Sequence, residues 1–207
     1  MTEFYFIRHG QTDANAEGIK QGVINTDITK LNDTGKSQIK KLHSVFNISF
    51  ADELIHSPLT RTVESAEILN EGYNLPTSTD ERLLEISYGQ WDGQKNSDLH
   101  KKYPRYFDQH LNDVLPEYVE VATKGETFPQ VVARVKSFML EKTLNTPDKK
   151  YIVVTHGFTI KAAALGVIEP QNPMTLPEPN NASVTKIVTL ARTQQMYLEY
   201  YNREFKF

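Results

Sequence analysis

The chain has 207 residues, of which 39% are hydrophobic and 24% charged, and its formal net charge at pH 7 is -3. This length is enough for one domain with a buried core, and the composition is typical of globular proteins. The small negative charge argues against nucleic acid or an anionic membrane surface as a partner. The sequence contains no cysteine, which excludes disulfides, thiolate metal sites and a cysteine nucleophile.

No segment resembles a membrane span or a targeting sequence. No run approaches the ~18 consecutive apolar residues of a membrane helix. The apolar run near the N-terminus ends at Arg8 and is too short for a signal peptide. We therefore expect a cytoplasmic protein whose partner is a small molecule, while the sequence leaves its oligomeric state open.

Strand-like and helix-like segments alternate along the first part of the chain. The pair Asp33-Thr34 has side chains that cap a helix, and Pro58 suits the first turn of another. Gly72 ends that second helix. In order, the pattern predicts a strand at 2–8, a helix from about 33 to 46, a short strand at 53–56, a helix after 58, and strands around 77–79 and 83–86.

Residues 94–124 have a different composition, rich in charge and in aromatic side chains, with prolines at 104 and 116. This segment is interpreted as an inserted cap of short helices over one end of the sheet. The alternation of strands and helices then resumes. The pattern predicts a helix at 127–144, a strand at 150–155, a helix at 157–166, and strands at 182–191 and 195–203 joined by a turn near 192–194.

This order predicts a single α/β domain spanning residues 1–207. Strands that alternate with helices form a mostly parallel sheet between two helical layers, which is a three-layer α/β/α sandwich. The final hairpin supplies an antiparallel edge. The small helical insertion at 94–124 is expected to cover the active site.

Two of the predicted strands end in the dipeptide His-Gly, at His9-Gly10 and at His156-Gly157. Ligands of parallel α/β folds bind at the carboxyl ends of the strands, so the two imidazoles are expected to face one ligand. Arg8 beside the first histidine, and Arg61 at another strand-to-helix junction, indicate that this ligand is an anion, most plausibly a phosphate.

Other polar residues near these motifs have narrower interpretations. Thr12 and Asn15 add short polar donors to the loop that follows the first motif. The remaining histidines lack the spacing of metal ligands, and we interpret them as structural or surface residues. These are His43, His56, His100 and His110. No metal site is expected.

A pair of histidines without a cysteine suits covalent phosphoryl transfer. A neutral imidazole is a nucleophile, and phosphohistidine is labile enough for rapid transfer to water. His9 can attack if a backbone carbonyl fixes the proton on its other nitrogen. His156, Arg8 and Arg61 can stabilise the transferring group. Glu85 follows an apolar Leu-Leu pair and can supply the proton that the leaving oxygen needs.

A set of short motifs spans nearly the whole chain in a characteristic order. They are Arg8–Thr12 with Asn15, Gln21-Gly22, Asp27, Leu31, Gly35, Ser57–Arg61, Glu81–Glu85 with Gly89–Gly93, Gly125-Glu126 and Val154–Gly157. By this ordered set the chain resembles the histidine phosphatase superfamily, which also contains the cofactor-dependent phosphoglycerate mutases. Arg-His-Gly alone would be weak support, whereas the full series is specific.

The resemblance implies a role for each matching residue. His9 would be the phosphorylated nucleophile and Glu85 the proton donor, with Arg8, Arg61 and His156 holding the phosphoryl group. The remaining matches are assigned to substrate or phosphate binding, and the resemblance implies neither a metal nor an organic cofactor. The binding residues are Thr12, Asn15, Gln21, Gly22, Gly157 and Phe158.

Departures from the family pattern bear on the substrate. Ile86 stands where the mutases carry a substrate-binding arginine, and residues 94–124 lack the adjacent arginine pair of the mutases. Phe158 follows His156-Gly157 where small or amide side chains are usual, so we expect it to narrow the pocket or to add an aromatic wall. Tyr88-Gly89 does match the mutases.

These departures favour a phosphatase for small phosphorylated metabolites. A cofactor-dependent phosphoglycerate mutase and a catalytically inactive domain that binds phosphorylated ligands remain alternatives.

Overall fold

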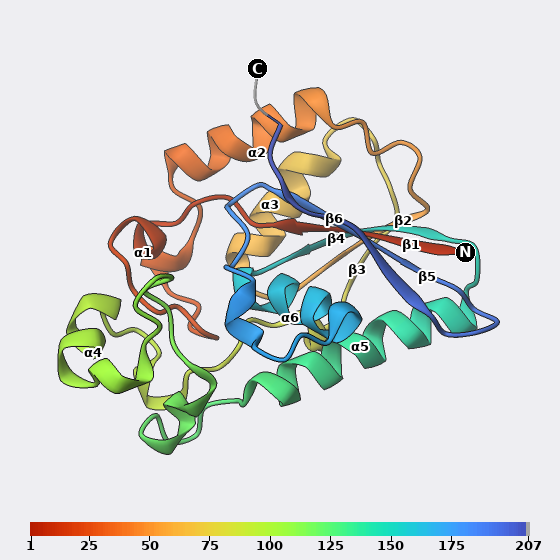
Figure 1. Ribbon diagram of the computed structural model, residues 1–207. Coiled ribbons are helices and arrows are strands. Elements are labelled where there is room, and N and C mark those ends of the chain that lie inside the picture. The colour runs from red at the N-terminus through yellow and green to blue at the C-terminus, as the bar shows by residue number, and fades with distance from the viewer. Residues whose placement is uncertain (206–207) are drawn as a thin grey trace.

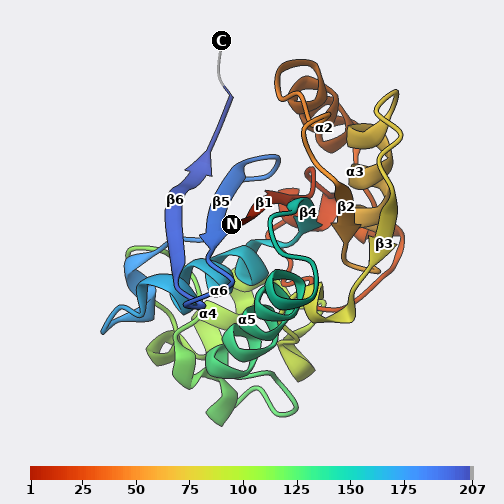
Figure 2. The same cartoon turned by 90° about the vertical axis from the view of Figure 1, so that its right-hand side faces the viewer.

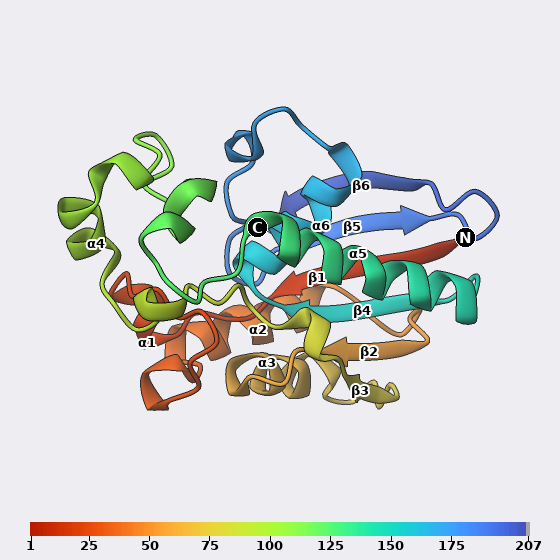
Figure 3. The same ribbon diagram turned by 90° about the horizontal axis from the view of Figure 1, so that it is seen from below.

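The computed structural model describes residues 1–205, in which six strands form one sheet of order β3-β2-β4-β1-β5-β6 (Figure 1, Figure 3). The strands are β1 (Thr2–Arg8), β2 (Glu53–His56), β3 (Thr77–Thr79), β4 (Lys150–Thr155), β5 (Val184–Thr189) and β6 (Met196–Arg203). Strands β3, β2, β4 and β1 are parallel, and β5 pairs antiparallel with both β1 and β6. The predicted parallel sheet with an antiparallel edge is confirmed.

The register between β1 and β4 creates the site. Arg8 lies opposite Thr155 at the carboxyl ends of these parallel neighbours. The next residue of each strand is a histidine, so His9 and His156 leave the sheet side by side. Their ring centroids are 5.3 Å apart. The expected meeting of the two His-Gly motifs is therefore present.

Helices cover both faces of the sheet (Figure 2). The α-helices are α1 (Asp13–Ala16), α2 (Asp33–Val45), α3 (Thr60–Asn70), α4 (Asn96–Lys102), α5 (Phe128–Asn145) and α6 (Gly157–Ile168). Side chains of a strand alternate between the faces. Ile7 accordingly packs in the cluster beneath α2 and α3, whereas Phe4 and Phe6 pack in the cluster beneath α5 and α6. The three-layer α/β/α fold is confirmed.

The segment 94–124 lies beside the carboxyl ends of β1 and β4, at the left of Figure 1. It contains α4 and the short 3-10 helices Pro104–Tyr106 and Pro116–Glu120. Trp91 stacks on Tyr103 and Phe107 from this segment, with ring centroids 5.2 and 6.0 Å away. Aromatic side chains of this segment therefore pack on Trp91, which precedes it in the sequence. Residues 111–113 of the segment line the site.

Three local expectations are corrected. No strand forms at 83–86. The Arg134 side chain donates hydrogen bonds to the carbonyl oxygens of residues 82, 84 and 85, which in a sheet would accept from a neighbouring strand. Helix α3 begins at Thr60, so Pro58 precedes the helix and does not lie in its first turn as expected. The N-cap of α2 is Asn32, whose side chain accepts from Gly35 N.

No helix of the described residues is long and apolar enough to cross a bilayer. The most apolar helix, α6, has 12 residues.

Candidate active site

His9 is held as a neutral imidazole of defined tautomer. Its Nδ1 donates to the carbonyl oxygen of Gly10 at 2.7 Å, which leaves the lone pair on Nε2. Burial lowers the pKa of His9 well below its ordinary value, and the nearby charges of Arg61 and Arg8 lower that pKa further. The result is an unprotonated ring nitrogen beside two cations, which is the form a nucleophile needs.

Arg61 is a fully buried cation. Burial lowers its pKa to about 10, so it stays charged near neutral pH. Its guanidinium donates to the carbonyls of Gly22 (2.8 Å) and Ile24 (3.1 Å) and to His156 Nδ1 (3.3 Å). No carboxylate forms an ion pair with it in residues 1–205. A buried cation whose partners are all neutral favours an anionic ligand.

His156 lies behind Arg61 and carries its proton on Nε2. Because Nδ1 accepts from Arg61, Nε2 is the donor in the 2.7 Å hydrogen bond to Ser57 Oγ. Burial lowers the pKa of His156 well below its ordinary value, as does the charge of Arg61. The sequence predicts that His156 contacts the phosphoryl group directly. For that contact, the ring would have to break its hydrogen bond to Ser57 or to Arg61.

Arg8 extends from the end of β1 toward the loop before β5. It donates to Pro179 O at 2.6 Å, and its guanidinium lies 3.7 Å from the carboxylate of Glu178. The buried Nε of Arg8 has no hydrogen-bond partner in the described part of the chain. Gly157 permits this approach, because a Cβ there would overlap Glu178 Oε2 and Arg8 Cζ.

Glu85 is 8% exposed and sits at the N-terminus of α6. Its carboxylate accepts from the backbone N–H groups of Ile86, Phe158 and Thr159 at 3.0–3.2 Å, and from the Thr159 hydroxyl at 3.2 Å. These donors stabilise the carboxylate that remains after a proton is given away. The carboxylate of Glu85 is thus held in a fixed position at the edge of the site.

Hydrogen bonds of Thr12 hold the loop after β1 together. This buried residue is the N-cap of α1, where its hydroxyl accepts from Asn15 N and can donate to Gln21 Oε1 at 3.1 Å. Asn15 Oδ1 in turn accepts from Thr12 N. Thr12 therefore positions the amides of Asn15 and Gln21, whose NH₂ groups are left to donate to a ligand. Gly22, at a φ of 47°, follows this loop.

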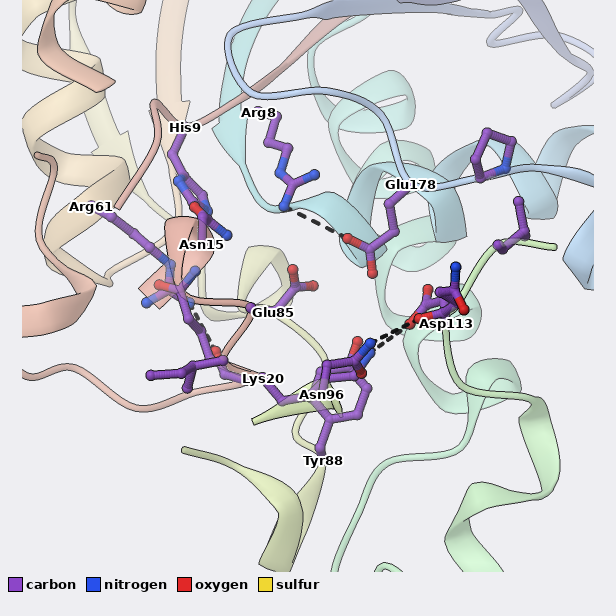
Figure 4. Close-up of a pocket in the computed structure, with 17 residues that line it drawn as sticks. Arg8, His9, Asn15, Lys20, Arg61, Glu85, Tyr88, Asn96, Asp113 and Glu178 are labelled. Carbon is purple, nitrogen blue, oxygen red and sulfur yellow. Dashed lines mark hydrogen bonds and ion pairs between the residues drawn. The ribbon is translucent and has the colours of Figure 1, made fainter. Parts of the chain in front are cut away.

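These groups surround one cavity of ≈ 350 Å³ at the carboxyl ends of the strands (Figure 4). Seven predicted site residues line it, namely Arg8, His9, Asn15, Gln21, Gly22, Arg61 and Glu85. The other predicted residues, Thr12, His156, Gly157 and Phe158, lie behind this lining.

The expectation for the Phe158 side chain is wrong. It is fully buried and packs on Phe128, with ring centroids 4.3 Å apart, so it forms no wall of the cavity. The first turn of α6 directs this side chain into the core beneath the sheet, and only the Phe158 N–H reaches the site, through Glu85.

The structure adds residues that the sequence did not single out. Glu178, Asp113 and Lys20 line the cavity from loops without a recognisable motif. Arg134 stands behind Glu85 and donates to the carbonyls of residues 82, 84 and 85 at 2.7–3.1 Å. It also pairs with Glu126 at 3.0 Å. Glu126, from the Gly125-Glu126 motif, thus supports the Glu85 segment together with Arg134.

A sequence model of the histidine phosphatase superfamily (branch 1) matches residues 4–202. The chain belongs to this superfamily. The match confirms the predicted family and the predicted class of enzyme.

Named relatives of this superfamily cover most of the chain. Phosphoserine phosphatase 1 of Hydrogenobacter thermophilus is 31% identical over 81% of this chain and 78% of its own length. A 2,3-bisphosphoglycerate-dependent phosphoglycerate mutase of Thermoplasma acidophilum is 27% identical over 76% of this chain and 72% of its own. The structure of Bacillus stearothermophilus YhfR superimposes with a TM-score of 0.85 at 24% identity, covering 99% of this chain and 98% of that one, which supports the fold.

The two buried imidazoles make stability depend on pH. Burial lowers the pKa of His9 and of His156, whereas both titrate near ~6.5 in the unfolded chain. Their contribution to the free energy of unfolding is complete above pH ~6.5 and is lost as the pH falls toward the folded-state pKa values. Urea denaturation from neutral to acidic pH should show His156→Gln reducing the slope by up to about 1.4 kcal/mol per pH unit. An unchanged slope would contradict a buried neutral His156.

Arg134 should contribute more to the free energy of unfolding than an exposed arginine does. Arg134→Met leaves three carbonyl acceptors of the Glu85 segment without their donor, and we expect a loss of roughly 2 kcal/mol in the free energy of unfolding. The matched control is Arg105→Met, which removes an exposed pair with Glu120 and should reduce the free energy of unfolding clearly less. Chemical denaturation measures both, and equal losses would contradict the supporting role of Arg134.

Proposed function

We propose that the protein is a phosphomonoesterase that hydrolyses small phosphorylated metabolites through a phosphohistidine on His9. The observation that carries this proposal is the state of His9, whose Nε2 lone pair lies free beside Arg8 and Arg61. The superfamily match and the phosphatase names of relatives support the reaction class. The chain would act as one domain over residues 1–207, with 94–124 as its cap. Residues 206–207 lie outside the described part, and a cytoplasmic location stays a prediction.

In the first step, His9 Nε2 attacks the phosphorus atom of the substrate. A P–N bond forms and the bond from phosphorus to the ester oxygen breaks, while Glu85 gives its proton to the leaving oxygen. The free alcohol departs and Glu85 becomes a carboxylate with its four donors in place. Arg8 and Arg61 stabilise the charge on the phosphoryl oxygens, and the amides of Asn15 and Gln21 assist.

In the second step, water attacks the phosphorus of the phosphohistidine. The Glu85 carboxylate takes a proton from that water, the P–N bond breaks, and inorganic phosphate leaves. His9 returns to its neutral tautomer, and Glu85 is again protonated for the next turnover. His156 contributes by orienting the Arg61 guanidinium through its Nδ1.

The mutase alternative has a named relative in its favour. A mutase must bind a second anionic group on the leaving-group side. In this chain Lys20 on that side is paired with Asp113 at 2.5 Å, and Glu178 adds a further carboxylate. Ile86, at the position of the mutase arginine, is fully buried. These contacts favour hydrolysis. The inactive-domain alternative finds no support, because His9, Glu85 and both arginines meet in one cavity.

His9→Ala should abolish phosphate release, with a loss of at least about a thousandfold, because the proposed covalent intermediate forms on the Nε2 of His9. The measurement is release of phosphate from a panel of metabolite phosphates and from 4-nitrophenyl phosphate, with a metal chelator present. Circular dichroism establishes that the variant is folded. Residual turnover near that of the native protein would rule out the covalent mechanism.

Glu85→Gln should discriminate between leaving groups. An alkoxide needs a proton as it departs, whereas 4-nitrophenolate needs almost none, so we expect kcat to fall ~100-fold for alkyl phosphates and much less for the aryl ester. Glu81→Gln is the control on the same segment, since Glu81 lies outside the cavity. Equal losses for both ester types would remove Glu85 from the role of proton donor.

A further inference from the structure

The part of the cavity that faces away from His9 is lined by residues that no step above uses. Lys20, Tyr88, Asn96, Asp113 and Glu178 come from the N-terminal loop, the segment after Glu85, the cap and the loop before β5 (Figure 4). The leaving alcohol of a substrate must occupy this space, because Arg8 and Arg61 take the phosphate. These residues therefore decide which alcohols fit.

The charges of this region are unbalanced in favour of carboxylates. Lys20 Nζ lies 2.5 Å from Asp113 Oδ1, and both side chains are largely shielded from solvent, so each neutralises the other. The cation that pairs with Glu178 is Arg8, whose guanidinium lies 3.7 Å from the Glu178 carboxylate. In the proposed mechanism this guanidinium also binds the phosphate. Once Arg8 turns to a phosphoryl group, Glu178 has no cation of its own.

The two carboxylates also repel one another. Burial raises the pKa of Glu178 to about 7, and the next largest cause is the negative charge of Asp113. Both line the same cavity, Asp113 from segment 94–124 and Glu178 from the loop before β5. A positive group placed between them would remove this repulsion.

A third acceptor in the same region lacks a donor. The Oδ1 of Asn96 is buried and has no hydrogen-bond partner in the described part of the chain. Its Nδ2 donates to Asn112 O at 2.8 Å, which identifies the other atom as the oxygen. A buried acceptor without a partner is costly, and a ligand that brings an N–H donor would satisfy it.

We propose that Glu178, Asp113 and Asn96 form a subsite for a positively charged nitrogen on the leaving alcohol. The enzyme then prefers phosphate esters of amino alcohols to esters whose alcohol is neutral or anionic. This inference rests on the proposed phosphatase activity and names its substrate class. An ammonium group donates three hydrogen bonds, which matches two carboxylates and one amide oxygen.

The test compares O-phosphoethanolamine with ethyl phosphate, which has the same carbon chain without the amine. We expect kcat/KM to be at least tenfold higher for O-phosphoethanolamine, and 3-phosphoglycerate, whose alcohol carries a carboxylate, to be the poorest of the three. An ammonium group also makes its alcohol a better leaving group, so the native ratio is not sufficient alone. The deciding quantity is the change of this ratio in variants.

Glu178→Gln and Asp113→Asn should each reduce the preference for O-phosphoethanolamine at least fivefold. Asp98→Asn removes an exposed carboxylate from α4 of the same cap and should leave the ratio unchanged. A ratio that stays constant in both subsite variants would overturn the proposal while the phosphatase activity stands.

A second measurement keeps the subsite testable if the protein releases phosphate from none of these esters, including 4-nitrophenyl phosphate. That result would contradict the phosphatase proposal by itself. Calorimetric titration of His9→Ala with O-phosphoethanolamine and with ethyl phosphate then tests the subsite without turnover. Tenfold tighter binding of the amine supports it, and equal affinity or the reverse order overturns it.

Discussion

The site depends on two neutral imidazoles held beside two cations at the ends of neighbouring parallel strands. The register of β1 and β4 places His9 and His156 together, and burial with the charges of Arg61 and Arg8 keeps both rings unprotonated. A buried guanidinium with only neutral hydrogen-bond partners carries a desolvation cost. In the proposed mechanism a phosphoryl group offsets that cost on binding, so the arrangement favours the transferring anion.

Much of the remaining structure fixes the groups around this pair. Arg134 and Glu126 hold the Glu85 segment from behind, and the N-terminus of α6 presents N–H groups to the carboxylate. Gly22 permits Asp92 to approach the loop, since a Cβ at that position would overlap the Asp92 carboxylate. Segment 94–124 contributes Asn96 and Asp113 to the lining of the cavity. In our proposal, the residues that bind the phosphate and those that bind the alcohol thus come from different parts of the chain.

The sequence predicted the elements whose residues carry their own local pattern. Apolar runs ending in His-Gly marked β1 and β4, and the motifs around Arg61 and Glu85 identified the groups that meet in the cavity. It did not predict Glu178, Asp113 or Lys20, because loop residues show no periodicity and their meeting is set by the tertiary fold. The Phe158 side chain was placed wrongly, because a motif position does not fix the direction in which the first turn of α6 points. The strand expected at 83–86 is absent because Arg134, which is distant in sequence, donates hydrogen bonds to the backbone carbonyls of this segment.

The steric course at phosphorus tests the central claim most directly. Transfer from a phosphomonoester with an isotopically chiral phosphorus atom to an acceptor alcohol records how many in-line displacements occur. Two displacements, first onto His9 and then away from it, invert the configuration twice, so the account predicts net retention. Net inversion would mean a single direct displacement, and His9 would then not be a covalent nucleophile.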